Sequence, residues 1–106
     1  MSQTNNVKIS IIIVNYNNAK YLKKSLETTL NQSYRNKEII VIDDMSNDNS
    51  LEVLKNYKKK IKFYLKKKKT KYGSYNQINC YHQGFKKSNG KYIFFLDSDD
   101  YFKNNK

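Results

Sequence analysis

Apolar residues in this chain fall into four short runs separated by longer polar stretches. The runs are rich in β-branched and aromatic residues, which is typical of strands. They occupy residues 7–14, 37–42, 61–65 and 92–96. Strands that are apolar along their whole length belong to parallel sheets covered by helices on both faces. The pattern therefore predicts four buried strands of an α/β domain.

The stretches between the apolar runs have the spacing of amphipathic helices. A helix is expected over 19–32, with Asn18 as its N-cap. A second is expected over 49–57, where Asn49 and Glu52 form a variant of the capping box.

A third helix is expected to begin at Ser74 or Asn76 and to run to about Ser88. Its inner face would be Ile78, Tyr81 and Phe85, and Gly90 would follow its end. Strand and helix then alternate, with strands about 25 to 30 residues apart, which predicts right-handed crossovers. The expected fold is a Rossmann-like, doubly wound, mostly parallel sheet in a single domain over 1–106.

Polar residues follow three of the predicted strands. The first strand ends in Asn15-Tyr16-Asn17, the second in Asp43-Asp44, and the fourth in the acids from Asp97 to Asp100. In parallel sheets ligands bind beyond the carboxyl ends of the strands. We therefore expect these ends to converge on one rim.

Asp97 and Asp99 are two residues apart, so in extended chain their side chains would face one ligand together. Crowded carboxylates repel each other unless a cation lies between them, and hard oxygen ligands suit Mn²⁺ or Mg²⁺. The alternative for an isolated D-x-D motif is a solvated acidic turn.

Charge and composition narrow the choice of partner. The net charge is +12, and of the 21 Lys and Arg residues only Arg35 is an arginine. Scarcity of arginine argues against specific nucleic-acid recognition, so the charge indicates general solvation or contact with an anionic membrane. The single cysteine, Cys80, permits no internal disulfide and fits a cytoplasmic protein. No apolar stretch reaches 18 residues.

No glycine-rich phosphate loop follows the first strand, and no Walker motif is present. A nucleotide bound here would therefore need a metal to hold its phosphates. Several sequence motifs lie in and around the predicted strand ends, at residues 9–17, 30–34, 38–50, 84 with 90–93, and 95–100. In that order and spacing they resemble the N-terminal half of family 2 glycosyltransferases of the GT-A fold.

The resemblance implies a transferase that uses a nucleoside-diphosphate sugar. It implies that Tyr16 lies against the base and that Asp44 accepts a hydrogen bond from it. Asp97 and Asp99 would form the D-x-D pair that holds the ribose and the metal, with Asp99 as the leading metal ligand. The full nucleotide-sugar set implied is Asn15, Tyr16, Asn17, Asp44, Ser46 and Asp97. The alternative for Tyr16 is a packing role, and Asp43 is expected to brace its loop.

The chain departs from the family at several positions. Tyr81 stands where many relatives carry an arginine near the diphosphate, so phosphate neutralisation would fall on the metal and on Lys69 or Lys71. His82 is expected to be an ordinary helix residue. The catalytic base is expected beyond Lys106, so the domain is expected to be incomplete. The fourth strand would then be a bare apolar edge that favours self-association.

The function expected from these features is sugar transfer to a saccharide or lipid-linked acceptor in cell-surface polysaccharide synthesis, at the inner face of the membrane. One alternative is a non-catalytic basic module that binds RNA or anionic lipid. A phosphorylated receiver domain is disfavoured, because the first strand ends in Asn15 and Tyr16 rather than in an acid pair.

Overall fold

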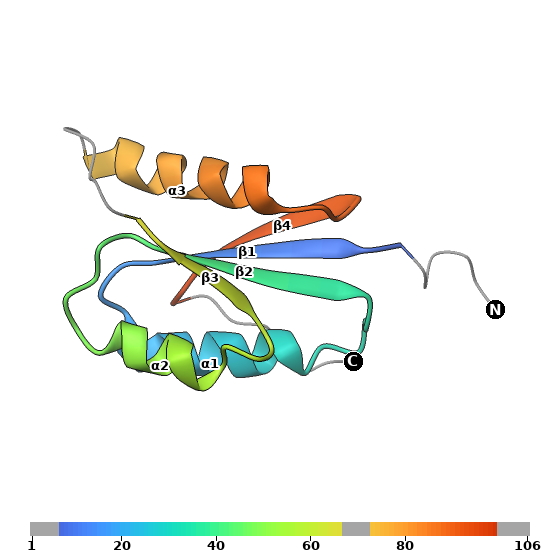
Figure 1. Cartoon of the computed structure of the whole chain (residues 1–106), viewed down its shortest axis with the longest axis horizontal. Coiled ribbons are helices and arrows are strands. Elements are labelled where there is room, and N and C mark those ends of the chain that lie inside the picture. Colours follow the sequence, from blue (N-terminus) through green and yellow to red (C-terminus); the bar gives the residue numbers. More distant parts are fainter. Residues whose placement is uncertain (1–6, 67–72, 100–106) are drawn as a thin grey trace.

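The computed structural model describes residues 7–66 and 73–99. Strands and helices alternate along the chain, as the hydrophobic pattern predicted (Figure 1). The elements are β1 (Ile9–Asn15), α1 (Ala19–Leu30), β2 (Lys37–Asp43), α2 (Ser50–Asn56), β3 (Lys62–Leu65), α3 (Gly73–Lys87) and β4 (Tyr92–Asp97).

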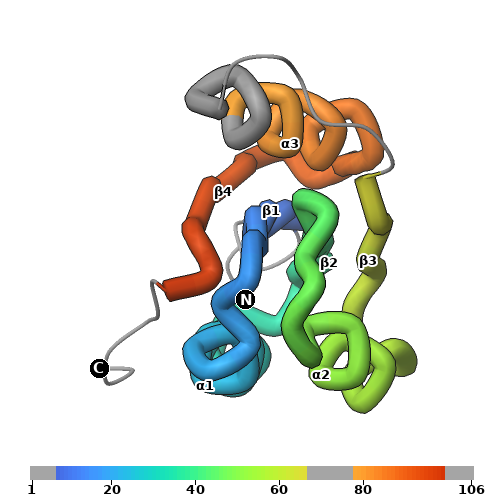
Figure 2. The backbone as a smooth tube through the Cα atoms, turned by 90° about the vertical axis from the view of Figure 1, so that its left-hand side faces the viewer, coloured from blue at the N-terminus to red at the C-terminus, as the bar shows by residue number. Residues whose placement is uncertain are grey.

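The four strands form one sheet in the order β3-β2-β1-β4, and every neighbouring pair is parallel. Figure 2 shows α1 and α2 on one face of the sheet and α3 on the other. This arrangement confirms the expected doubly wound α/β fold.

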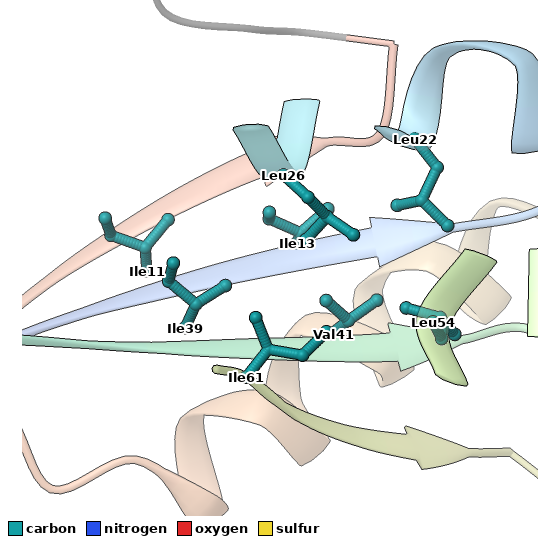
Figure 3. Close-up of a cluster of buried hydrophobic side chains, with 8 residues drawn as sticks. All are labelled: Ile11, Ile13, Leu22, Leu26, Ile39, Val41, Leu54 and Ile61. Carbon is teal, nitrogen blue, oxygen red and sulfur yellow. The ribbon is translucent and has the colours of Figure 1, made fainter. Parts of the chain in front are cut away.

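Within residues 7–66 and 73–99, the core consists of one apolar cluster on each face of the sheet. Residues of β1 and β2 alternate between the two clusters, so both strands are buried after their first residues, Ile9 and Lys37. Figure 3 shows the cluster that faces α1 and α2, which contains Ile11, Ile13, Leu22, Leu26, Ile39, Val41, Leu54 and Ile61. The cluster beneath α3 contains Val14, Ile40, Ile42 and Cys80.

The inner face of α3 differs from the prediction. Ile78 and Phe85 are 60% and 53% exposed, whereas Cys80 and Gly84 are buried. A Cβ atom on Gly84 would lie 2.4 Å from Cγ2 of Ile12. The helix approaches β1 so closely that small side chains are required there, and the bulky apolar ones turn outward.

The strand β4 is the second departure. It lies at the edge of the sheet, and Tyr92, Phe94 and Phe95 are about half exposed. The prediction that this run is buried on both faces is therefore wrong for the described chain. The expectation that it forms an apolar edge is confirmed.

Hydrogen bonds at the amino ends of the strands fix where β4 begins. The buried Glu38 carboxylate accepts hydrogen bonds from Ser10 Oγ at 2.5 Å and from the Asn89 amide at 2.7 Å, and the Gly90 amide donates to Ser10 Oγ at 2.8 Å. A Cβ on Gly90 would lie 2.5 Å from Ser10 Oγ, so this glycine serves close approach. It lacks the positive φ expected of a helix C-cap.

Burial raises the pKa of Glu38, but these hydrogen bonds and the charge of Lys8 outweigh burial and hold the pKa below its usual value.

The side chain of Asp48 accepts hydrogen bonds from the first residues of both α1 and α2, the two helices that cover one face of the sheet. Asn18 and Asn49 occupy the N-cap positions, as predicted, but neither makes a side-chain cap hydrogen bond in the described part of the chain. Instead Asp48 accepts from the Ala19 amide at 3.0 Å and from the Ser50 amide at 2.9 Å. The loop after β1 is thereby tied to the loop after β2.

Candidate donor site at the carboxyl ends of the strands

Three polar strand ends lie next to one another, because β1 pairs with β2 on one side and with β4 on the other. The register places Asn15 opposite Asp43 and Val14 opposite Asp97. Residues separated by more than fifty positions in the sequence therefore share one rim of the sheet.

The loops after β1 and β2 are held together by side-chain hydrogen bonds. Asn15 Nδ2 donates to Asp43 Oδ1 at 2.8 Å, and Ser46 donates to the same carboxylate through its amide at 2.9 Å and its hydroxyl at 2.7 Å. The Asn17 amide donates to Ser46 Oγ at 2.9 Å, and Asn17 Oδ1 accepts from the Asn47 amide at 2.8 Å. Asp43 braces its loop as expected, and Asn15, Asn17 and Ser46 shape the rim by tying its loops.

Two residues of these loops have left-handed backbone conformations. The φ angles of Asn17 and Met45 are 51° and 59°. This region is unfavourable for side chains with a Cβ, although asparagine tolerates it better than most residues. Such conformations persist where the surrounding contacts determine them, and they concentrate at functional sites.

Asp44 is buried against a lysine. Its Oδ1 lies 3.5 Å from Lys66 Nζ, and the two side chains are only 10% and 4% exposed. Asp44 Oδ1 accepts no hydrogen bond from the described residues. Lys66 was missed in the sequence, because it is the first of a run of lysines and nothing there distinguishes it from its neighbours.

Cys80 of α3 lies close to this pair. Burial raises the pKa of its thiol to about 11, the negative charge of Asp44 adds to the increase, and Lys66 opposes it. The thiol is therefore protonated at neutral pH, and it serves as an apolar support for the rim.

Asp97 is anchored by the neighbouring residue of the same helix, α3. The Tyr81 hydroxyl donates a hydrogen bond to Asp97 Oδ1 at 2.9 Å. The strand β4 ends at Asp97, and the backbone turns at Ser98 and Asp99, leaving Asp99 exposed. The expectation that extended chain carries Asp97 and Asp99 on the same side is therefore not met, because the turn intervenes.

Tyr16 lies at the end of β1 and is 47% exposed. Part of its ring is thus at the surface, where a flat ligand can stack on it. His82 is an exposed residue of α3, as expected. Asp100, Lys69 and Lys71 lie outside the described residues.

The donors at the rim suit a hard cation that also binds substrate. Asp97 and Asp99 supply carboxylate oxygens, and no group of three His, Cys, Asp or Glu side chains gathers within 7–66 and 73–99. Mg²⁺ is commonly held by one or two carboxylates and completed by water and substrate phosphates. As carboxylates, the two aspartates suit the chemistry of that kind of ion, with phosphate as the source of further ligands.

The described helices include none that is long and apolar enough to cross a membrane.

The chain matches glycosyl transferase family 2 over residues 10–106. It is 40% identical over 97 residues to the poly(ribitol-phosphate) beta-N-acetylglucosaminyltransferase TarP of Staphylococcus aureus, covering 88% of this chain and 28% of that protein. It is 37% identical over 94 residues to the UDP-Glc:alpha-D-GlcNAc-diphosphoundecaprenol beta-1,3-glucosyltransferase WfaP of Escherichia coli, covering 89% and 36%.

Solved structures share the fold. S. aureus TarS 1-349 in complex with UDP-GlcNAc superposes with a TM-score of 0.69 at 28% identity, over 89% of this chain and 27% of that one. The mannosyltransferase PcManGT of Pyrobaculum calidifontis, in complex with GDP-Man and Mn²⁺, gives a TM-score of 0.76 over 92% of this chain and 29% of that one. At 17% identity, the second likeness concerns the fold alone.

Together the parallel sheet, its rim and these matches define a GT-A glycosyltransferase architecture. The chain belongs to glycosyl transferase family 2. It spans 28% and 36% of the lengths of TarP and WfaP.

Proposed function

We propose that this protein binds a nucleoside-diphosphate sugar at the rim through Mn²⁺ or Mg²⁺, and that it belongs to a transferase acting on a saccharide or lipid-linked acceptor. The observation that carries the proposal is the adjacency of the ends of β1, β2 and β4, which brings Asp44 and Asp97 to one edge. The named complexes of TarS with UDP-GlcNAc and of PcManGT with GDP-Man and Mn²⁺ support the donor class and the metal.

In this proposal the nucleotide base lies between the loops after β1 and β2. Tyr16 stacks on the base, and Asp44 accepts a hydrogen bond from a base N–H group. Asn15, Asn17 and Ser46 keep the two loops in place through the hydrogen bonds described above.

The diphosphate lies toward β4 in this proposal. Asp99 and Asp97 hold the metal, and Asp97 also contacts the ribose. When bound, the ion neutralises the charge that develops on the departing nucleoside diphosphate. We assign no acceptor-activating base among the described residues.

The acceptor class is inferred from the relatives. TarP is named for transfer to poly(ribitol-phosphate), and WfaP for transfer to a sugar on diphosphoundecaprenol. We therefore infer a role in cell-surface polysaccharide synthesis. Location in the cytoplasm at the inner face of the membrane stays a prediction.

Titration calorimetry with UDP, GDP and dTDP, each with and without Mn²⁺, tests the donor site. We expect one of these nucleotides to bind more tightly with the metal, and Asp99→Ala to reduce that metal-dependent gain at least about tenfold, because a metal ligand is lost. Glu52→Ala is the matched control, since it removes an equal charge from an exposed residue of α2.

Retention of the full Mn²⁺ effect by Asp99→Ala would exclude Asp99 from the metal site. Nucleotide binding that ignores Mn²⁺, together with RNA or anionic-vesicle binding that falls steeply with salt, would favour the basic-module alternative.

A further inference from the structure

One hydrogen bond links the outer helix to the acid at the end of β4. The Tyr81 hydroxyl donates to Asp97 Oδ1 at 2.9 Å, and the Tyr81 ring packs edge-on against Phe95, with centroids 5.2 Å apart at 89°. The phenol is thus held by its ring as well as by its hydroxyl. A hydrogen bond to a carboxylate is stronger and more directional than one between neutral groups.

The position of Tyr81 depends on how closely α3 lies on the sheet. Gly84 follows Tyr81 by three residues, so the two lie on neighbouring turns of one helix face. The absence of a side chain at Gly84 lets α3 approach Ile12, to which a Cβ would come within 2.4 Å. The same close packing of α3 on the sheet buries Cys80 near Asp44. Consecutive residues of α3 therefore support the acids at the ends of two different strands.

The side chains that contact Asp44 and Asp97 differ in charge. Asp44 faces the cation of Lys66, whereas the contact from Tyr81 to Asp97 comes from a neutral donor. A neutral donor can orient a carboxylate without adding positive charge beside a cation site. Without it, repulsion from neighbouring acids would favour other orientations of the Asp97 side chain.

We propose that Tyr81 is a positioning residue of the donor site, which orients the Asp97 carboxylate toward the metal-bound diphosphate. This inference rests on the proposed function and adds a residue from α3 to it.

The variant Tyr81→Phe removes the hydroxyl and keeps the ring against Phe95. We expect the gain in nucleotide-diphosphate affinity caused by Mn²⁺ to fall about tenfold, because a hydrogen bond to a charged group is lost. The thermal midpoint is expected to stay unchanged. Calorimetry with and without Mn²⁺ measures the nucleotide affinity, and the electron paramagnetic resonance of Mn²⁺ measures the metal directly.

Tyr64→Phe is the matched control. Like Tyr81, Tyr64 of β3 packs against the buried cluster beneath α3. Its hydroxyl makes no hydrogen bond to the described acids of the rim. It is expected to behave as the wild type in every measurement.

A double-mutant cycle with Asp97→Ala separates positioning from packing. If Tyr81 acts through Asp97, Tyr81→Phe has no further effect once Asp97 is replaced. An equal loss of affinity in both backgrounds would show a general structural role and overturn the inference, as would a Tyr81→Phe variant with the full Mn²⁺ gain. A wild-type protein without Mn²⁺-dependent nucleotide binding would instead overturn the proposed function itself.

Discussion

At the scale of single residues, the rim depends on partners that the sequence does not reveal. The acids at the strand ends stand out as motifs, whereas Lys66 and Tyr81 stand out only through the contacts they make with Asp44 and Asp97. A lysine and a tyrosine are ordinary surface or packing residues until the fold places them beside a carboxylate. Their roles could not be inferred from residue type.

The buried pair of Lys66 and Asp44 makes a prediction about stability. Lys66→Met should lower the free energy of unfolding by about 3 kcal/mol, because it leaves a buried carboxylate without its cation. Lys62→Met is the control, from the strand β3 that Lys66 follows. Lys62 is 54% exposed and lies 3.4 Å from Glu38, so its loss should cost less than about 1 kcal/mol.

Glu38 also keeps Lys8 and the hydrogen bond from Ser10 when Lys62 is replaced. Urea denaturation of both variants measures the difference. Equal, small effects would mean that the Asp44 carboxylate does not depend on Lys66.

At the scale of elements, the existence and order of the seven helices and strands in the described residues followed from the hydrophobic pattern. The errors concern faces and ends. Of the predicted inner face of α3, Tyr81 does pack against the buried cluster, but Ile78 and Phe85 turn outward, because close packing on β1 favours Cys80 and Gly84 over larger side chains. The N-cap positions were predicted correctly, but the side chain that accepts the amide hydrogen bonds at both helix starts is that of Asp48, from a loop that folds between them.

The close approach of α3 predicts an unusual sign for a glycine substitution. Glycine to alanine within an exposed helix usually stabilises it by up to about 1 kcal/mol. Gly84→Ala should instead destabilise the protein by about 1–3 kcal/mol, because the new Cβ meets Ile12. In an Ile12→Ala background the penalty should largely disappear, since the contacted atom is gone. Thermal or urea unfolding of the four proteins measures this coupling, and a stabilising Gly84→Ala in the wild-type background would contradict it.

At the scale of the whole molecule, one edge of the sheet carries exposed apolar side chains. The edge strand β4 exposes Tyr92, Phe94 and Phe95, while the described core lies around β1 and β2. Apolar edges with unpaired backbone groups favour pairing with another chain. Self-association through β4 therefore stays a prediction for this chain.

Sedimentation velocity over a series of protein concentrations tests it. We expect association that Phe94→Lys weakens, because a charge at an edge opposes strand pairing. Tyr21→Lys replaces an aromatic residue of α1 with similar exposure and should leave association unchanged. A protein that sediments as a monomer at every concentration would contradict the prediction.

Some basic residues lie at the end of the sheet opposite the rim. A hollow of about 580 Å³ at the amino ends of the strands is lined in part by Arg35, Lys37 and Lys60. With a net charge of +12, contact with an anionic membrane remains a prediction.

The sequence by itself determined the α/β class, the alternation of strands and helices, the parallel direction of the strands and the acids at the strand ends. These features are local, since apolar runs of strand length and polar residues at their ends are visible without knowing what packs against them. The family likewise followed from motifs in a fixed order.

Only the tertiary structure decided which residues meet at the rim and what holds each of them. The order β3-β2-β1-β4 brings the ends of β1, β2 and β4 together, and α3 then places Tyr81 and Cys80 beneath the acids. Such partners are set by distances between segments far apart in the chain. Burial then gives each contact its strength, because a charge withdrawn from water depends on its protein neighbours.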